Sequence, residues 1–333
     1  MKDVIVLSKN GLYCPAGDFY IDPWKPIETS FITHAHSDHA RSGAEKYYTS
    51  LRGLSLFKHR LKGYANAQDA VGVPFGKKIK INEAWVSFHS AGHILGSAQL
   101  RVEVKNKVWV ASGDYKRTPD PSCDPFEVVP CDAFISEATF ALPIYRWESG
   151  EVTAQKIKDW WHSDRSRPSI LFCYSLGKAQ RVLAELKKIS DETVYLHGAA
   201  VGLTDIYRAE GIDMLQTLPV SEVPKDFDFA GCLILAPPSA HRSSWMKRFK
   251  EPQTAFGSGW MQVRGARRRG GYEKGFILSD HADWNELIQT IDETGAQKII
   301  LTHGREDVLA RVLREKGLEV AHFTTEYSDE EIG

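Results

Sequence analysis

The sequence predicts a mixed α/β protein, in which a strand-rich, sandwich-like domain is interrupted by an inserted parallel α/β domain and then completed. Three observations support this prediction. The first third of the chain consists of short β-branched runs separated by turn residues, such as DVIVL and SFITHAH. After about Ala141, helical stretches alternate with short apolar strands, which is typical of a parallel sheet. From FILSDHADW at residues 276–284 onwards, the first pattern returns.

Composition limits the classes of protein that remain. The 333 residues are 42% hydrophobic and 26% charged, and the net charge of −1 argues against a protein that coats nucleic acid with its whole surface. No apolar run approaches the ~18–20 residues of a membrane span, and the N-terminal apolar stretch is shorter than a signal-peptide core. The five cysteines lack any C-x-x-C spacing, as expected for buried free thiols. We therefore expect a cytoplasmic protein that makes no membrane contact.

The first part of the sandwich domain is expected to span residues 1–142. Its strands are indicated by YIDPW, SFITHAH, EAWVSFHSA and the alternating run AQLRVEVKNKVWVASGD. The central Lys105-Asn106-Lys107 of that last run predicts a hairpin. A helix is expected to start near Asp38.

The inserted domain is expected over residues 143–268. The helix EVTAQKIKDWWHS opens it, the strand SILFCYSL and the helix GKAQRVLAELKKIS follow, and TVYLHG, CLILAPP and TAFGSGW are further short strands. Residues 269–333 complete the first domain with the helix NELIQTIDETG, the strand KIILTHG and the helix EDVLARVLREKG. The acidic end, EYSDEEIG, is expected to be solvated.

One short stretch crowds metal-binding side chains together. THAHSDHA, at residues 33–40, carries His34, His36, Asp38 and His39 at the end of a predicted strand. If the extended geometry continues, residues 34 and 36 point the same way, so both imidazoles reach one cation. Neutral imidazole suits zinc, and a neighbouring carboxylate suits a second divalent ion. The stretch therefore predicts a metal site.

Further candidate ligands follow other predicted strands. His93 lies in the glycine-flanked turn SAGHILG, Asp114 comes directly after the strand KVWVAS, and His303 ends the strand KIIL. Each alone has the position of an ordinary turn residue. Their joint occurrence at strand ends favours a single site with more than one metal ion.

The series HxHxDH, AGH, SGD and THG resembles the metallo-β-lactamase fold, and the insertion makes the chain similar to the β-CASP nuclease branch of that superfamily. The resemblance covers nearly the whole chain and implies two divalent ions, Zn²⁺ or Mn²⁺. Their implied ligands are His34, His36 and His93 for one ion, Asp38, His39 and His303 for the other, and Asp114 between them. Asp22, in YIDPW, matches the acidic residue that supports the histidine loop in this family.

Two other segments match motifs of the β-CASP branch. SEATF supplies Glu137 and SDHADW supplies His281. Two divalent ions hydrolyse phosphodiesters by sharing a hydroxide and stabilising both oxygens of the displacement. The resemblance then implies that His281, oriented by Glu137, protonates the leaving oxygen. Asp38 and Asp22 are placed with them among the residues that carry catalysis.

Nucleic acid is expected in the cleft between the two domains. SLGKAQR resembles the turn that opens the insertion in these nucleases, and there a helix N-terminus and Lys178 are candidates to hold a phosphate, although a plain helix start accounts for the pattern equally well. A basic run precedes His281 by fewer than twenty residues and is expected to bind phosphates. Its residues are Arg264, Arg267, Arg268 and Arg269.

Within the family, the chain resembles the bacterial ligase-associated DNA exonucleases through TFALPIYRW and SGWM…SDHADWNELI. This implies a DNA exonuclease of DNA repair, with a DNA ligase and a helicase as partners. His303 favours an RNA-processing endo- or exoribonuclease instead, because DNA-directed animal members usually lack that histidine. Two further alternatives are a small-molecule metallo-hydrolase, which would need neither the insertion nor the basic run, and a scaffold with a dead site, which would have lost ligands.

Overall fold

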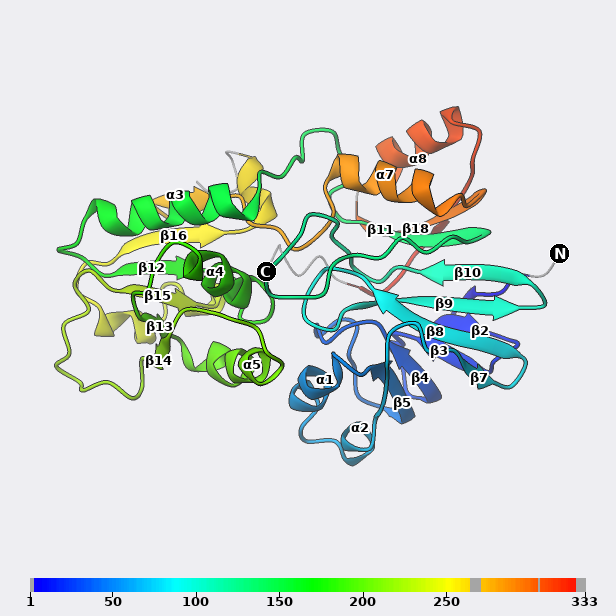
Figure 1. Cartoon of the computed structure of the whole chain (residues 1–333), viewed down its shortest axis with the longest axis horizontal. Coiled ribbons are helices and arrows are strands. Elements are labelled where there is room, and N and C mark those ends of the chain that lie inside the picture. The colour runs from blue at the N-terminus through cyan, green and yellow to red at the C-terminus, as the bar shows by residue number, and fades with distance from the viewer. Residues whose placement is uncertain (1–2, 264–270, 305, 328–333) are drawn as a thin grey trace. The chain divides into compact units, whose positions relative to one another are not determined.

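The computed structural model describes residues 3–263, 271–304 and 306–327. It confirms the mixed α/β class, with helices packed on three sheets in the described ranges. The described residues group into two compact units (Figure 1). Unit 1 is built from Met1–Pro119, Cys123–Arg146 and His281–Ile332, and unit 2 from Asp120–Ser122 and Trp147–Asp280.

The first sheet of unit 1 runs in the order β1-β2-β3-β4-β5-β6. Its strands are β1 (Val6–Ser8), β2 (Gly11–Cys14), β3 (Phe19–Ile21), β4 (Ile27–Ile32), β5 (Ala44–Ser50) and β6 (Val71–Val73). The first three strands pair antiparallel, and β3 to β6 pair parallel. Because β3 and β4 run parallel, the residues that follow them, Asp22 and Thr33, leave the sheet at the same edge.

The second sheet of unit 1 runs in the order β19-β18-β11-β10-β9-β8-β7. Its strands are β7 (Ile79–Ile81), β8 (Ala84–Ser90), β9 (Ala98–Val104), β10 (Lys107–Ala111), β11 (Ala133–Ala138), β18 (Lys298–Gly304) and β19 (Glu319–Phe323). The predicted hairpin joins β9 to β10 and is confirmed. Its turn residues, Lys105 and Asn106, have φ of 47° and 65°, as a two-residue turn with two left-handed positions requires.

The two sheets of unit 1 pack face to face over a common core. Phe31 and Tyr48 of the first sheet meet Phe88, Leu100 and Trp109 of the second. Helices cover both outer faces, so the layers are helices, sheet, sheet and helices (Figure 1). These helices are α1 (Leu54–Arg60) and α2 (Ala65–Gln68) on the first sheet, with α7 (Trp284–Thr294) and α8 (Glu306–Glu315) on the second.

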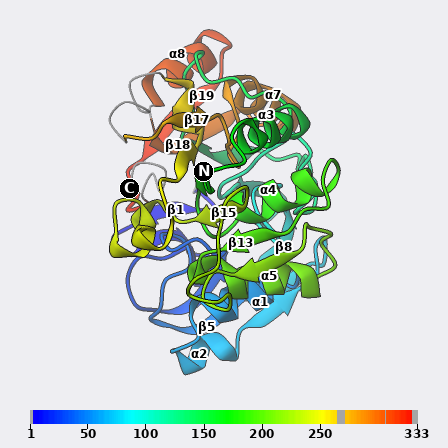
Figure 2. The same ribbon diagram turned by 90° about the vertical axis from the view of Figure 1, so that its left-hand side faces the viewer.

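Unit 2 contains a parallel sheet in the order β14-β13-β15-β12-β16-β17. Its strands are β12 (Ser169–Phe172), β13 (Val194–Leu196), β14 (Thr217–Pro219), β15 (Leu233–Ala236), β16 (Gln253–Gly257) and β17 (Lys274–Phe276). The central strands β12 and β15 are buried throughout, which explains their uninterrupted apolar sequences SILF and LILA. The chain from α3 to β17 can be followed in Figure 2 by its change from green through yellow.

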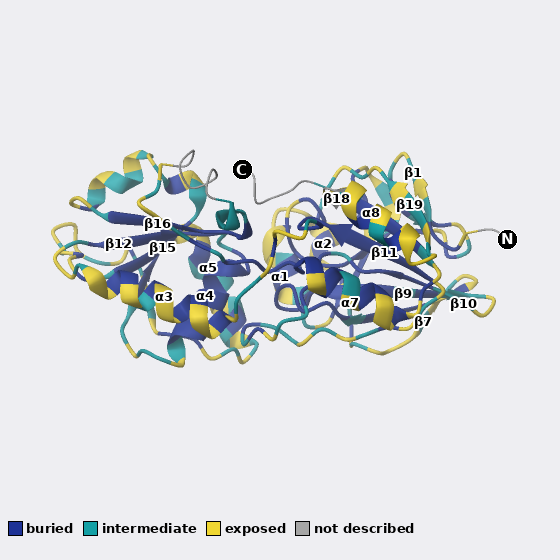
Figure 3. Cartoon of the chain, turned by 90° about the horizontal axis from the view of Figure 1, so that it is seen from above, coloured by how far each residue is buried: buried dark blue, intermediate teal, exposed yellow. Residues whose placement is uncertain are grey.

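Different segments cover the two faces of this sheet. The helices are α3 (Gly150–Ser163), α4 (Lys178–Lys187) and α5 (Gly198–Ala209), and the 3₁₀ turns are η1 (Pro238–Ala240), η2 (Ser244–Arg248) and η3 (Gly259–Gln262). Ile170 and Phe172 of β12 face a cluster that includes Trp245 and Met246 of η2. α3 and α4 lie along the other face and turn their buried sides to it (Figure 3). None of the helices in the described part of the chain has both the length and the apolar character that a bilayer crossing demands.

Candidate metal centre

The histidine stretch leaves β4 as an irregular turn. The helix expected from Asp38 does not form: residues 37–39 make a single turn, closed by the Ala40 N–H, which donates to the His36 carbonyl at 2.8 Å, and the turn is not continued. This turn gathers the imidazoles rather than spreading them around a helix. The ring centroids of His34 and His36 lie 4.9 Å apart, and those of His34 and His39 lie 4.2 Å apart.

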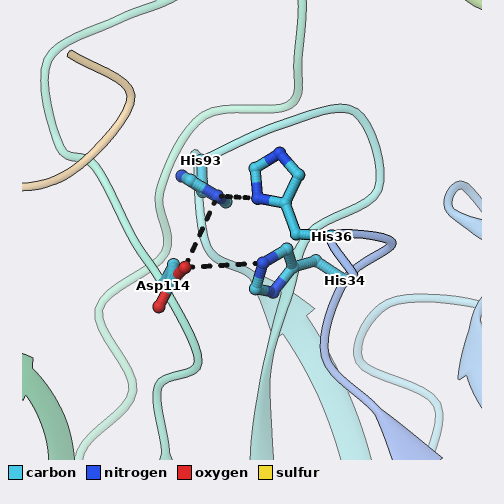
Figure 4. A group of neighbouring side chains, drawn as sticks. All are labelled: His34, His36, His93 and Asp114. Atoms are coloured by element: carbon cyan, nitrogen blue, oxygen red, sulfur yellow. Dashed lines mark hydrogen bonds and ion pairs between the residues drawn. The ribbon is translucent and has the colours of Figure 1, made fainter. Parts of the chain in front are cut away.

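Four buried side chains bring donor atoms within 4.8 Å of one another (Figure 4). They are His34, His36, His93 and Asp114. Nε2 of His93 lies 3.0 Å from Nδ1 of His36. Oδ2 of Asp114 lies 3.5 Å from Nε2 of His34 and 3.7 Å from Nε2 of His93. Strand ends supply all four, since β4 precedes the first two, the turn between β8 and β9 carries the third, and β10 precedes the fourth.

The spacing of these atoms fits a divalent ion. A tetrahedral Zn²⁺ at about 2.0–2.1 Å from its ligands places neighbouring donors roughly 3.3–3.4 Å apart. The separations of 3.0, 3.5 and 3.7 Å in the structure bracket that value. Nε2 of His34 is buried and makes no hydrogen bond within the described residues, which is costly for a polar atom that binds nothing. The residues present therefore fit a metal ion.

The second oxygen of Asp114 faces a second group. Its Oδ1 lies 3.6 Å from Nε2 of His39, and that same Nε2 lies 3.5 Å from Oδ2 of Asp38. Asp114 thus presents one carboxylate oxygen to each group of side chains. His303 occupies β18, and its side chain lies outside the described residues.

Asp22 and Thr33 orient two of the imidazoles by hydrogen bonds to their Nδ1 atoms. Oδ2 of Asp22 accepts from Nδ1 of His39 at 2.7 Å and from Oγ1 of Thr33 at 2.5 Å, and its Oδ1 accepts the Thr33 N–H at 2.8 Å. Because the Thr33 hydroxyl gives its proton to Asp22, it accepts from Nδ1 of His34 at 3.0 Å. Both rings therefore carry Nδ1–H and direct Nε2 into the centre.

Thr33 was not predicted from the sequence. The one signal for it is a hydroxyl residue directly before His34, and the partner that gives the hydroxyl its meaning lies eleven positions earlier in the chain.

The pKa values of two of the histidines are shifted in opposite directions. Burial, reinforced by the charge of His39, holds the pKa of His34 well below its usual value, so this ring is neutral and able to bind a cation. Burial alone would also lower the pKa of His39. The carboxylates of Asp38, Asp114 and Asp22 outweigh it and raise the pKa of His39 to about 10.

His281 and Glu137 form a buried pair beside the candidate metal ligands. Nδ1 of His281 lies 2.8 Å from Oε2 of Glu137, and Oε1 of Glu137 accepts the Tyr115 N–H at 2.7 Å. The carboxylate is therefore fixed by the backbone, and it fixes the imidazole in turn. The centroids of His281 and His93 are 4.7 Å apart.

The predicted phosphate-binding residues fall in two places. Arg264, Arg267, Arg268 and Arg269 lie outside the described residues. Lys178 begins α4 but is buried, with its ammonium 2.8 Å from Asp280 and 4.8 Å from the centroid of Tyr174. A role for Lys178 in binding phosphate stays a prediction.

All five cysteines are free thiols.

The chain shares sequence with parts of three known proteins. No family model matches the chain. A probable DNA ligase of Opitutus terrae is 32% identical over 322 residues, covering 94% of this chain and 30% of that protein. The endoribonucleases YSH1 of Yarrowia lipolytica and Eremothecium gossypii are 25% and 27% identical over 47% and 39% of this chain. The chain spans less than a third of each of these relatives, with 23% and 17% of the two endoribonucleases aligned.

A solved structure resembles the whole fold. It is a protein of unknown function from Enterococcus faecalis V583, with a TM-score of 0.59 and 14% identity, over 90% of this chain and 80% of that one. At this identity, the likeness concerns the fold alone. The buried histidines and aspartates are thus a candidate metal centre in an α/β chain that shares sequence with part of a ligase and part of two endoribonucleases.

Proposed function

We propose that the protein is a metal-dependent nuclease of the metallo-β-lactamase fold, β-CASP branch, which hydrolyses phosphodiester bonds. The observation that carries the proposal is the carboxylate of Asp114, whose two oxygens each face a different set of metal-binding side chains. The layered sheets of unit 1, the parallel sheet of unit 2 and the relatives named endoribonuclease support the same assignment.

The side chains divide between two divalent ions, Zn²⁺ or Mn²⁺. His34, His36 and His93 would hold one ion, and Asp38, His39 and His303 the other, with Asp114 shared. Bound there, the ions would supply a nucleophile at neutral pH and stabilise charge on the phosphate. Asp22 and Thr33 keep Nε2 of His34 and His39 turned towards them.

The proposed role of His281 is to donate a proton to the leaving oxygen. Its Nδ1 is held by Glu137, so Nε2 is the atom that faces away from the carboxylate. A histidine fixed in this way can protonate the sugar oxygen as the bond to phosphorus breaks. The negative Glu137 stabilises the charged ring until that transfer and holds it in one orientation.

We propose DNA as the substrate and an exonuclease acting in DNA repair. The relative named probable DNA ligase matches 94% of this chain but only part of its own length, which supports a nuclease that works with a DNA ligase. A helicase is the further partner that the resemblance to ligase-associated exonucleases implies. Segments 1–142 and 269–333 would form the catalytic domain, and 143–268 the inserted domain. Lys178 and the four arginines at 264–269 would contact phosphates, and the cytoplasm is the proposed location.

An RNA-processing nuclease is the second candidate. Both relatives named endoribonuclease support it, as does the presence of His303 at the end of β18. The two candidates share one chemistry and differ in the polymer that they select.

A matched pair of substrates separates these candidates. Single-stranded DNA and RNA of one sequence, labelled at either end, are incubated with the purified protein and Mn²⁺ or Zn²⁺. His36→Ala and His281→Ala are compared with His89→Ala, a histidine of β8 that pairs with Glu127 at 2.8 Å. We expect progressive loss of nucleotides from DNA by the wild-type protein and His89→Ala, and none by the other two variants.

Other outcomes have definite meanings. Preferential cutting of RNA would establish the second candidate. If neither polymer is cut while a small ester or thioester is, the protein is a small-molecule hydrolase and the proposal fails.

A further inference from the structure

A tyrosine near the end of the chain stacks on one of the proposed metal ligands. The ring centroids of Tyr327 and His39 lie 4.4 Å apart, with an angle of 16° between the ring planes. Trp24 meets the same tyrosine edge-on at 5.7 Å, so its ring is itself held in place. The sequence of the tail, EYSDEEIG, suggested a solvated end. The part of it that the structure describes instead contacts the histidine loop.

The hydroxyl of Tyr327 reaches the residue that orients the same imidazole. It donates to the backbone carbonyl of Asp22 at 3.2 Å. The side chain of Asp22 accepts from Nδ1 of His39 at 2.7 Å. The ring face of Tyr327 therefore contacts the imidazole of His39. Its hydroxyl contacts the backbone of Asp22, whose side chain holds Nδ1 of the same imidazole.

The neighbouring residue secures this contact by a second route. The Glu326 carbonyl accepts from Nη2 of Arg41 at 2.7 Å, and the Glu326 carboxylate lies 3.5 Å from Nζ of Lys25. Nε of Arg41 donates to the backbone carbonyl of Asp38 at 3.0 Å. The tail segment 326–327 is thus connected to both Asp38 and His39.

A single hydrogen bond does not fix the plane of the His39 ring. The bond from Nδ1 to Asp22 restrains one atom of His39, but it leaves the ring able to tilt about that contact. A flat partner 4.4 Å away opposes the tilt, because widening the angle between the planes beyond 16° brings the rings into collision on one side. The direction of Nε2 then stays fixed towards Asp38 and Asp114.

We propose that Tyr327 is a positioning residue for the second of the two metal ions, acting by holding the plane of the His39 imidazole. The proposal rests on the proposed function, since it assumes that Asp38, His39 and Asp114 hold an ion. It assigns a role in the centre to a segment that lies 285 positions from the loop it contacts.

Metal titration tests this role without relying on activity. Zn²⁺ is titrated against a competing fluorescent chelator, and bound metal is counted by elemental analysis, for the wild-type protein, Tyr327→Phe, Tyr327→Leu and Tyr327→Ala. Tyr272→Ala is the matched control, because Tyr272 stacks on His241 in unit 2 with centroids 4.2 Å apart. Near-ultraviolet circular dichroism verifies that each variant is folded.

The expected pattern is selective. Wild-type protein, Tyr327→Phe and Tyr272→Ala bind two ions with similar affinities, because the phenylalanine keeps the flat contact. Tyr327→Leu and Tyr327→Ala keep one tight ion and bind the other roughly 10- to 100-fold more weakly, the usual effect of removing a supporting residue. Raising the Zn²⁺ concentration restores the second equivalent.

Three results would overturn the proposal. The first is equal affinities in Tyr327→Ala and Tyr272→Ala, and the second is a parallel loss of both ions in folded Tyr327→Leu. The third is a single bound ion in the wild-type protein. That result would contradict the proposed dinuclear site as well, and so separates a failure of the proposed function from a failure of the role of Tyr327.

Discussion

At the scale of single residues, the centre depends on carboxylates that each contact two other side chains. Asp114 faces both groups of donors, and Oδ2 of Asp22 accepts from two side chains at once. A substitution at either position therefore changes both halves of the centre.

Asp114→Asn tests the shared carboxylate. The amide keeps the shape of the side chain but replaces one of the two charged oxygens with an NH₂ group, which cannot bind a cation. We expect bound metal to fall from two equivalents to one and nuclease activity to fall at least ~100-fold, beyond the usual loss for a supporting residue. Elemental analysis and end-labelled oligonucleotides measure the two effects. Unchanged stoichiometry would show that Asp114 does not bridge.

Thr33→Val tests the hydroxyl that links Asp22 to His34. Valine has nearly the same shape but no hydroxyl. The buried Oδ2 of Asp22 and Nδ1 of His34 therefore each lose a hydrogen bond to residue 33, at a cost of about 1–3 kcal/mol in unfolding free energy. Affinity for the ion on His34 should fall by roughly 10- to 100-fold. Thr33→Ser retains the hydroxyl and should remain close to wild type in urea unfolding and Zn²⁺ titration. Equal behaviour of the two variants would contradict this role.

The same residues mark how far the sequence could predict the site. Ligands that share one stretch, such as His34 and His36, are apparent from their spacing. Thr33 and Tyr327 are not, because a hydroxyl or an aromatic ring acquires its role only from a partner that folding brings close. The ion pair of Lys178 with Asp280 is likewise absent from the local sequence, which indicated only a lysine at a helix start.

At the scale of elements, local signals predicted the regular structure well. The helix α7 was expected from its apolar periodicity, and it has a reciprocal cap at one end and a left-handed glycine at the other. The Asp283 side chain accepts the Glu286 N–H at 3.0 Å, the Glu286 side chain accepts the Asp283 N–H at 3.1 Å, and Gly295 has φ of 69°. The helix expected to start near Asp38 was predicted wrongly, because the single turn closed by the Ala40 N–H and the His36 carbonyl is not continued.

Asp283→Ala tests whether the start of α7 positions His281, two residues before it. Loss of an N-cap costs about 1 kcal/mol, and Ser149→Ala, which removes the cap of α3, should cost a similar amount. We expect both variants to lower the urea midpoint equally. Only Asp283→Ala should lower kcat, because His281 shifts from Glu137. Equal kcat values in the two variants would contradict the link.

At the scale of the whole molecule, each unit carries its own core, but the candidate metal centre belongs to unit 1. Its buried carboxylates, Asp22, Asp38 and Asp114, lie among histidines that a cation would draw together. The return of the strand pattern late in the sequence indicated a domain completed by the last part of the chain, and β18 and β19 lie in the same sheet as β7 to β11. The sequence did not predict how the strand ends come together in one site, because strands that pair, such as β11 and β18, are far apart along the chain.

Removing the metal should loosen unit 1 selectively. After treatment with a chelator, we expect faster hydrogen exchange in the histidine loop and in the turns that carry His93 and Asp114, because uncompensated carboxylates repel one another there. Strands β12 and β15 of unit 2 should exchange as before. Added Zn²⁺ or Mn²⁺ should restore protection. Equal deprotection of both units would mean that the ions stabilise more than this centre.

The order in which the parts of the centre occur along the chain has a consequence for synthesis. The histidine loop leaves the ribosome early, whereas His281 and Tyr327 follow the entire inserted unit. A nascent chain therefore carries an early set of imidazoles long before the residues that would hold the proton and fix the ring of His39. A chain interrupted within the insertion would lack these groups, so under the proposed function it would carry the first imidazoles without the proton donor and without the ring that holds His39.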